Sequence, residues 1–155
     1  MMRKSMLTAA SCVLLVTAVP ATAGTPACAT KASDTADVEA TIKNFFATIE
    51  RGDIADARKM TTPGFHAFDV GKHFAGPELL DMIEGAQKQG RKIGFGIDKV
   101  EANVDCNFAW AHWLNPGNID ETPITWQESG VLRRAGKGWI IEFIHSERIS
   151  SPAAK

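Results

Sequence analysis

The feature that most constrains the fold is a change of hydrophobic period near Gly90. Before this point, apolar side chains recur every three or four residues, as the buried stripe of a helix requires. In the first such segment they are Val38, Ile42, Phe45, Phe46 and Ile49. After Gly90, apolar and polar residues alternate, which is typical of half-buried strands. Helices early in the chain and strands late in it predict an α+β fold, with the helices packed on one face of a sheet.

Turn and cap residues divide the chain into elements. We expect helices at 34–51, 54–61 and 77–89, a short strand at 65–70, and an antiparallel meander with strands at 93–104, 108–114, 124–134 and 139–149. The apolar parity shifts inside the first meander strand, which predicts a β-bulge near Asp98 or Lys99. Because a bulge bends a sheet, we expect a cone-shaped curved antiparallel sheet packed against three N-terminal helices and enclosing a pocket.

The first 23 residues have the three parts of a secretory signal peptide. Arg3 and Lys4 precede an apolar run at 6–19, and small residues at 21–23 fit cleavage after Ala23. The run is shorter than the roughly 20 apolar residues of a membrane span; a buried N-terminal helix is the alternative. We therefore expect a periplasmic or secreted protein without stable membrane insertion. It would have a flexible arm at 24–33, one domain at 34–150 and a disordered tail at 151–155.

The charge and the cysteine content of the chain restrict the classes of partner that it is expected to bind. The chain has 17 basic and 18 acidic residues and no basic run interleaved with aromatics, so nucleic acid is not an expected partner. Cys28 and Cys106 follow the predicted cleavage site and are candidates for a disulfide, with free thiols or a bridge between chains as alternatives. Neither cysteine has zinc-ligand spacing to another cysteine or to a histidine, so we expect no metal site. We expect no cofactor either.

Three stretches, in their order and spacing, resemble the SnoaL-like branch of the nuclear transport factor 2-like (ketosteroid isomerase-like) superfamily. They are a helix end, FATIERGD, at 46–53, a helix start, FAGPE, at 74–78, and a final hairpin from Gly130 to Ser146. The resemblance spans about 38–149. It implies a helix-backed cone and a function among those of isomerases, cyclases, dehydratases, ligand carriers and dimerisation modules.

The resemblance also singles out Asp69, which stands where ketosteroid isomerase-like members carry a proton-abstracting aspartate. Desolvation at the mouth of an apolar cavity would raise the pKa of this carboxyl and suit it to act as a general base. The other acid groups of those enzymes are missing. The chain has no tyrosine, Phe45 stands about where the phenol would be, and Gln127 and Gly130 occupy the region of the second acid. A turn residue before glycine is the alternative for Asp69.

Strand alternation completes the predicted site. One face of each strand is expected to collect Phe108, Trp110, His112 and Leu114, and Trp139, Ile141, Phe143 and His145. His112 and His145 would then enter the cavity beside Trp126 and Glu128 and form an acid–base set with Asp69. A slip of one residue would turn these side chains outward. The residues expected to bind ligand are Phe45, Phe68, Trp110, Trp126, Glu128 and Phe143.

Three functions follow as hypotheses. The first is a binding protein for a small apolar or aromatic molecule, because aromatic side chains commonly line such pockets. The second is an isomerase, dehydratase or cyclase with Asp69 as general base and His112 and His145 as partners. The third is a non-catalytic homodimer or interaction module, in which Trp113 on the outer sheet face would lie at the interface. Ordinary core packing is the simplest account of any single tryptophan.

Overall fold

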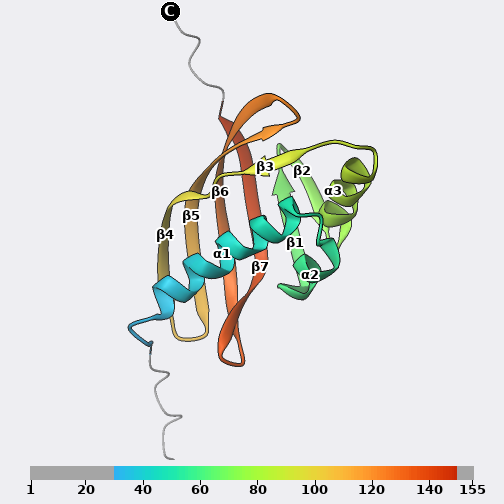
Figure 1. Cartoon of the computed structure of the whole chain (residues 1–155). Helices are drawn as coiled ribbons and strands as arrows, with labels where there is room; N and C mark the ends of the chain where they lie inside the picture. Colours follow the sequence, from blue (N-terminus) through green and yellow to red (C-terminus); the bar gives the residue numbers. More distant parts are fainter. Residues whose placement is uncertain (1–29, 150–155) are drawn as a thin grey trace, which may run out of the picture.

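The computed structural model describes residues 30–149, which form three helices and one curved mixed sheet (Figure 1). The helices are α1 (Asp34–Glu50), α2 (Ile54–Lys59) and α3 (Glu78–Lys88). The strands are β1 (Thr61–Asp69), β2 (Lys72–Ala75), β3 (Ile93–Phe95), β4 (Asp98–Asp105), β5 (Phe108–Ile119), β6 (Thr122–Ala135) and β7 (Gly138–Ile149). The α+β class, the three helices and their position on one face of the sheet are confirmed. The predicted signal peptide and tail lie outside the described residues, as does most of the predicted arm.

The sheet runs in the order β2-β1-β7-β6-β5, and the far edge of β5 is shared by β3 at one end and β4 at the other. β1 pairs with β7 in parallel, whereas the other pairs are antiparallel. The predicted bulge is confirmed, because the register shifts between Asp98 and Glu101 and Lys99 has φ 50°. At this bend the chain leaves β3 and begins β4, so one end of the sheet curls toward the helices.

Helix α1 crosses the inner face of the sheet and supplies the core (Figure 1). Val38, Ile42, Phe45 and Ile49 are each at most 1% exposed, as their helical spacing predicts. An ion pair holds the first turn of α1 to the sheet. Arg134 Nη1 and Nη2 lie 3.0 and 2.7 Å from the two carboxylate oxygens of Asp34, a bidentate geometry that fixes direction as well as distance.

Two parts of the sheet differ from the prediction. Strand β2 was not expected; it forms because Val70 and Gly71, with φ 47° and 76°, make a tight two-residue turn after β1. Pro116 and Gly117 were expected in a loop but continue β5. A Cβ on Gly117 would lie 2.1 Å from the carbonyl oxygen of Gly94, so glycine permits the close approach of β3.

A second bulge, in β7, decides which residues face the helices. Val131 pairs with Phe143 and Leu132 with Ile141, so Glu142 is an extra residue between them. Before the bulge, Trp139 and Ile141 are buried on the inner face; after it, Ile144 and Ser146 are. The inward parity therefore changes within one strand.

Candidate functional site

A cavity of about 130 Å³ lies between α1, α3 and the inner face of the sheet. For scale, an apolar protein cavity of about 150 Å³ accommodates benzene. Most of the lining is apolar: Phe45, Phe46, Ile49, Phe68, Leu79, Met82, Ile83, Ile93, Phe95, Ile119, Trp126 and Ile144. The polar lining residues in the described part of the chain are Asp69, Glu128, Ser146 and Arg148. The cavity is thus an apolar space with polar groups on three adjacent strands.

The polar groups form one row across the sheet. Asp69 on β1 is the register partner of Ser146 on β7, Ser146 is the partner of Glu128 on β6, and Glu128 is the partner of Trp113 on β5. Register partners on adjacent strands project from the same face a few ångströms apart. This row therefore brings together residues from distant parts of the chain.

Glu128 is the most constrained member of the row. Its Oε2 accepts hydrogen bonds from Trp113 Nε1 at 2.6 Å and Asn115 Nδ2 at 2.9 Å, and its Oε1 accepts one from Ser146 Oγ at 2.9 Å. Asn115 is itself held in place, because its Oδ1 accepts a hydrogen bond from the Gly96 amide at 3.2 Å. Glu128 is only 5% exposed, so these donors replace water around a buried carboxyl.

Both carboxyl groups of the row have raised pKa values. Burial raises the pKa of Glu128 to about 7, opposed by the hydrogen bonds from Asn115, Ser146 and Trp113, while the charge of Asp69 adds a further increase. Burial also raises the pKa of Asp69; Arg148 and a hydrogen bond with Ser146 oppose this, and Glu147 reinforces it. Two neighbouring carboxyls with raised pKa values are a common arrangement at acid–base sites.

Some of the residues predicted from the sequence meet at this cavity. Asp69, Phe45, Trp126 and Glu128 line it, as does Phe68, whose ring nevertheless contacts His73 at 4.8 Å between ring centroids. Ser146, Arg148 and Asn115 were missed. Nothing in the local sequence marks them, because they join the site through strand register alone.

The predicted face of β5 was wrong. Ala109, Ala111 and Trp113 are at most 2% exposed on the inner face, whereas Trp110 is 45% exposed and His112 also points outward. The prediction placed the larger aromatics inside, but the helix layer packs against small alanines at this strand. Trp113 was expected at an outer interface. It is instead a core residue that donates a hydrogen bond to the Glu128 carboxyl.

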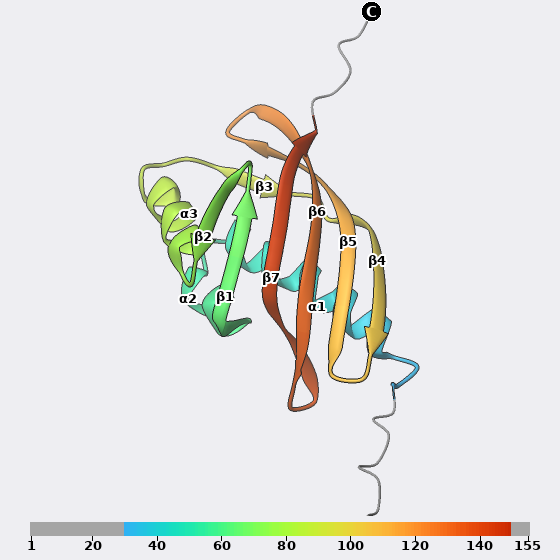
Figure 2. The same cartoon turned by 180° about the vertical axis from the view of Figure 1, so that it is seen from behind.

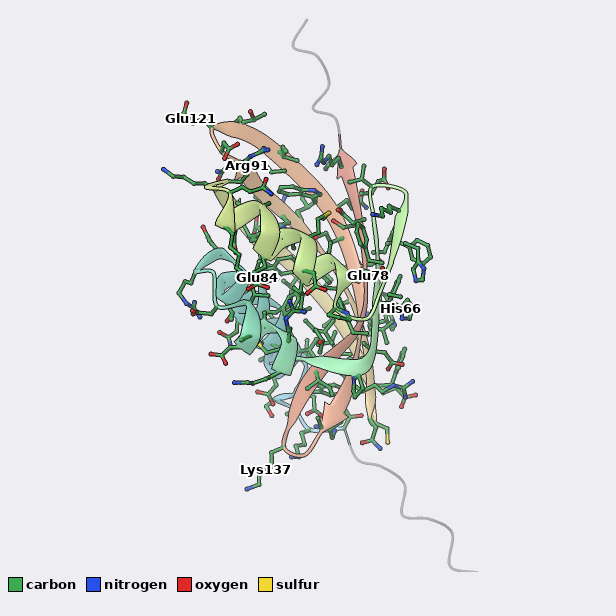
Figure 3. All side chains as sticks on the ribbon, turned by 90° about the vertical axis from the view of Figure 1, so that its right-hand side faces the viewer. His66, Glu78, Glu84, Arg91, Glu121 and Lys137 are labelled. Carbon is green, nitrogen blue, oxygen red and sulfur yellow. The ribbon has the colours of Figure 1, made fainter. Side chains whose placement is uncertain are left out.

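The β7 bulge also places Phe143 and His145 outside, so neither lines the cavity. All four histidines of the chain lie on the outer face: His66, His73, His112 and His145. Figure 3 shows His66 on the side of the sheet away from the helices. Of the three residues predicted as catalytic, Asp69 alone borders the cavity.

The sequence also led to predictions about metal binding, membrane insertion and a disulfide. Within residues 30–149 no cluster of three or more histidine, cysteine, aspartate or glutamate side chains is arranged to hold a metal ion, and no helix is long and apolar enough to cross a membrane. Cys106 lies in the turn between β4 and β5, with φ 58°. Its predicted partner, Cys28, lies outside the described residues, so the disulfide stays a prediction.

Three helices on one face of a curved, open mixed sheet define the nuclear transport factor 2-like, or cystatin-like, fold. The model of the SnoaL-like domain matches residues 38–152, and the chain belongs to this SnoaL-like family. The resemblance in the sequence is thereby confirmed. Among curated proteins, none matches the sequence.

Solved structures agree on the fold. A candidate dehydratase of the NTF2-like family from Streptomyces avermitilis superposes with a TM-score of 0.69 at 17% identity, over 79% of this chain and 100% of that one. An NTF2-like protein of unknown function from Pseudomonas putida KT2440 superposes with a TM-score of 0.67 at 18% identity, over 79% of this chain and 92% of that one. A ketosteroid isomerase-like protein from Erwinia carotovora atroseptica SCRI1043 superposes with a TM-score of 0.62 at 18% identity, over 78% of this chain and 100% of that one. At such identities the likeness concerns the fold alone.

Proposed function

We propose that this protein binds a small, uncharged compound about the size of a single ring in the cavity between α1, α3 and the sheet. The observation that carries the proposal is the division of the lining: apolar side chains from both helices, and hydrogen-bonding groups on β1, β6 and β7. An apolar ring would replace water against the helices, while one oxygen of the ligand would reach the polar row.

The charge of the polar row argues for an uncharged ligand. An anionic ligand would lie beside Asp69 and Glu128, and both carboxyls have pKa values raised by burial. Arg148 is the one cation among the lining residues in the described range, and it already lowers the pKa of Asp69 by its charge. A hydroxyl or carbonyl group can exchange hydrogen bonds with this row at a lower desolvation cost than an ion.

A second candidate is an enzyme of the isomerase, dehydratase or cyclase type with Asp69 as general base. It is favoured by the raised pKa of Asp69 at an apolar cavity. The dehydratase and ketosteroid isomerase-like names of two fold relatives agree with this class of chemistry. Since His112 and His145 lie across the sheet from the cavity, this candidate uses Glu128 as the partner of Asp69. The predicted signal peptide would put either activity in the periplasm or outside the cell.

A titration followed by methyl and amide NMR tests binding directly. Phenol, cyclohexanone and benzoate are the probes. The first two are expected to shift the methyl signals of Ile83, Ile119 and Ile144 saturably and to leave Val131, on the outer face, unchanged. Benzoate should bind at least tenfold more weakly. If no uncharged ring shifts the cavity methyl groups, the proposed function is wrong.

Two variants of α3 sharpen this test. Ile83→Phe adds bulk at the cavity lining and should weaken phenol binding at least tenfold. Lys88→Phe adds the same ring on the same helix, at a residue that does not line the cavity, and should bind phenol as the wild type does. Equal loss in both variants would mean that the probe binds elsewhere.

A further inference from the structure

The hydroxyl of Ser146 stands between two carboxyl groups. Its register partners are Asp69 on one side and Glu128 on the other, and its Oγ lies 2.9 Å from Glu128 Oε1. A serine hydroxyl has one hydrogen to donate and can accept hydrogen bonds at the same time. Ser146 therefore donates to one of the two carboxyls at a time, and can accept a hydrogen bond only from the carboxyl that carries a proton.

The surroundings of Glu128 fix where a proton can sit on it. Oε2 already accepts from Trp113 Nε1, which can only donate, and from Asn115 Nδ2. The amide of Asn115 cannot turn over without losing the hydrogen bond from Gly96. Glu128 can therefore carry a proton on Oε1 alone, the oxygen that faces Ser146.

We propose that Asp69, Ser146 and Glu128 form a relay that holds one proton and moves it between the two carboxyls. In one state Asp69 is protonated and donates to Ser146, which donates to ionised Glu128. In the other state Glu128 is protonated on Oε1 and donates to Ser146, which donates to ionised Asp69. This inference rests on the proposed function only in assuming that a ligand reaches Asp69.

Electrostatics favours one shared proton. Two carboxylates in a poorly solvated site repel, and the charge of Asp69 adds to the raised pKa of Glu128. The raised pKa values of both groups agree with one proton retained near neutral pH. The other charges that act on the pair are Arg148 and Glu147 beside Asp69, while the lining residues of α1 and α3 are apolar.

The relay defines a class of ligand and a step. An uncharged ring compound with a weakly acidic O–H or C–H would give a proton to the Asp69 carboxylate. The relay makes this possible when it holds the shared proton on Glu128 Oε1, because Ser146 then donates to Asp69 and Asp69 is ionised as the ligand binds. After the transfer Asp69 and Glu128 are both neutral, Ser146 keeps its one hydrogen, and the negative charge has moved to the ligand. The reverse transfer returns the proton, so no co-reactant is required. Ser146 is here a positioning residue.

The test uses Glu128→Gln, which imitates protonated Glu128. Its carbonyl oxygen can accept from Trp113 and Asn115, and its amide then donates to Ser146, which must turn to Asp69. Carboxyl-carbon NMR of labelled aspartate measures the pKa of Asp69. When Ser146→Ala is added to the Glu128→Gln variant, the pKa of Asp69 should rise by about one unit, which is equivalent to about 1.4 kcal/mol. In the wild-type background the same change should raise it much less.

The control is Ser129→Ala, on the outer face of β6, which should leave the pKa of Asp69 unchanged in both backgrounds. Equal shifts from Ser146→Ala in the two backgrounds would overturn the relay. The outcome is separate from ligand binding. Phenol binding without the background-dependent shift would leave a binding protein without a relay, and the shift without binding would leave a relay without the proposed function.

Discussion

The two faces of the sheet are made by alternate residues of the same strands, yet they collect opposite kinds of side chain. The inner face carries alanine, aliphatic and tryptophan core residues, the cavity and the Asp69–Ser146–Glu128 row. The outer face carries the four histidines and the exposed aromatics Phe108 and Trp110, and within residues 30–149 no helix covers it (Figure 2).

This difference shows that a side chain's chemistry here depends on its face more than on its type. The helices remove water from the inner carboxyls and raise their pKa values. His112 on the outer face is open to solvent and lies 3.6 Å from Glu101, which is also exposed. Charges in such surroundings are screened and interact weakly. The inner face is thus suited to ligand chemistry and the outer face to association.

The largest expected effect compares two tryptophans of β5. Trp113 is 2% exposed and Trp110 is 45% exposed. Trp113→Ala should lower the free energy of unfolding by about 3–5 kcal/mol, because it leaves a cavity and removes a donor from Glu128. Trp110→Ala should change it by less than about 0.5 kcal/mol. Urea unfolding of both variants measures this, and similar losses would contradict the assignment of faces.

The second effect concerns pH. Glu128 has an ordinary pKa of 4.5 when unfolded and about 7 when folded, so the folded state binds the proton more tightly. Its contribution to stability is complete below pH 4.5 and is lost as the pH rises through about 7. The wild type should lose roughly 3 kcal/mol more than Glu128→Gln over this range. Urea unfolding at several pH values measures the difference, and parallel curves for the two proteins would refute it.

The third effect addresses the outer face. A homodimer, which was one of the hypotheses from the sequence, remains a proposal, and the exposed Trp110 makes the outer face its natural interface. Trp110→Glu should weaken self-association at least tenfold, or about 1.4 kcal/mol, in sedimentation velocity. Lys137→Glu, in the turn between β6 and β7, serves as the control. A wild type that is monomeric at all concentrations would end the proposal.

The smallest effect compares two neighbours in β7. Ser146 faces the cavity and His145 faces out. Ser146→Ala should weaken phenol binding by about fivefold, equivalent to about 1 kcal/mol for one hydrogen bond. His145→Ala should change it by less than twofold. NMR titration with phenol measures both affinities. A larger loss of binding in His145→Ala than in Ser146→Ala would show that His145 belongs to the binding site.

The sequence by itself determined the features that depend on local order. The helical stripe of α1, the shift of parity near Lys99 and the succession of helices and strands sufficed for the α+β class and the family. Asp69, Trp126 and Glu128 were also found from the sequence, since the resemblance or the residue types marked them. These signals lie within short windows and need no knowledge of which strands pair.

Only the tertiary structure decided the faces of β5 and β7 and the composition of the polar row. Alternation shows that a strand has two faces but not which of them the helices cover, and one extra residue at Glu142 reverses the pattern. Asp69, Ser146 and Glu128 lie far apart in the chain and meet through the register of three strands. Their raised pKa values arise from burial, which is a property of the packed fold and not of the residue.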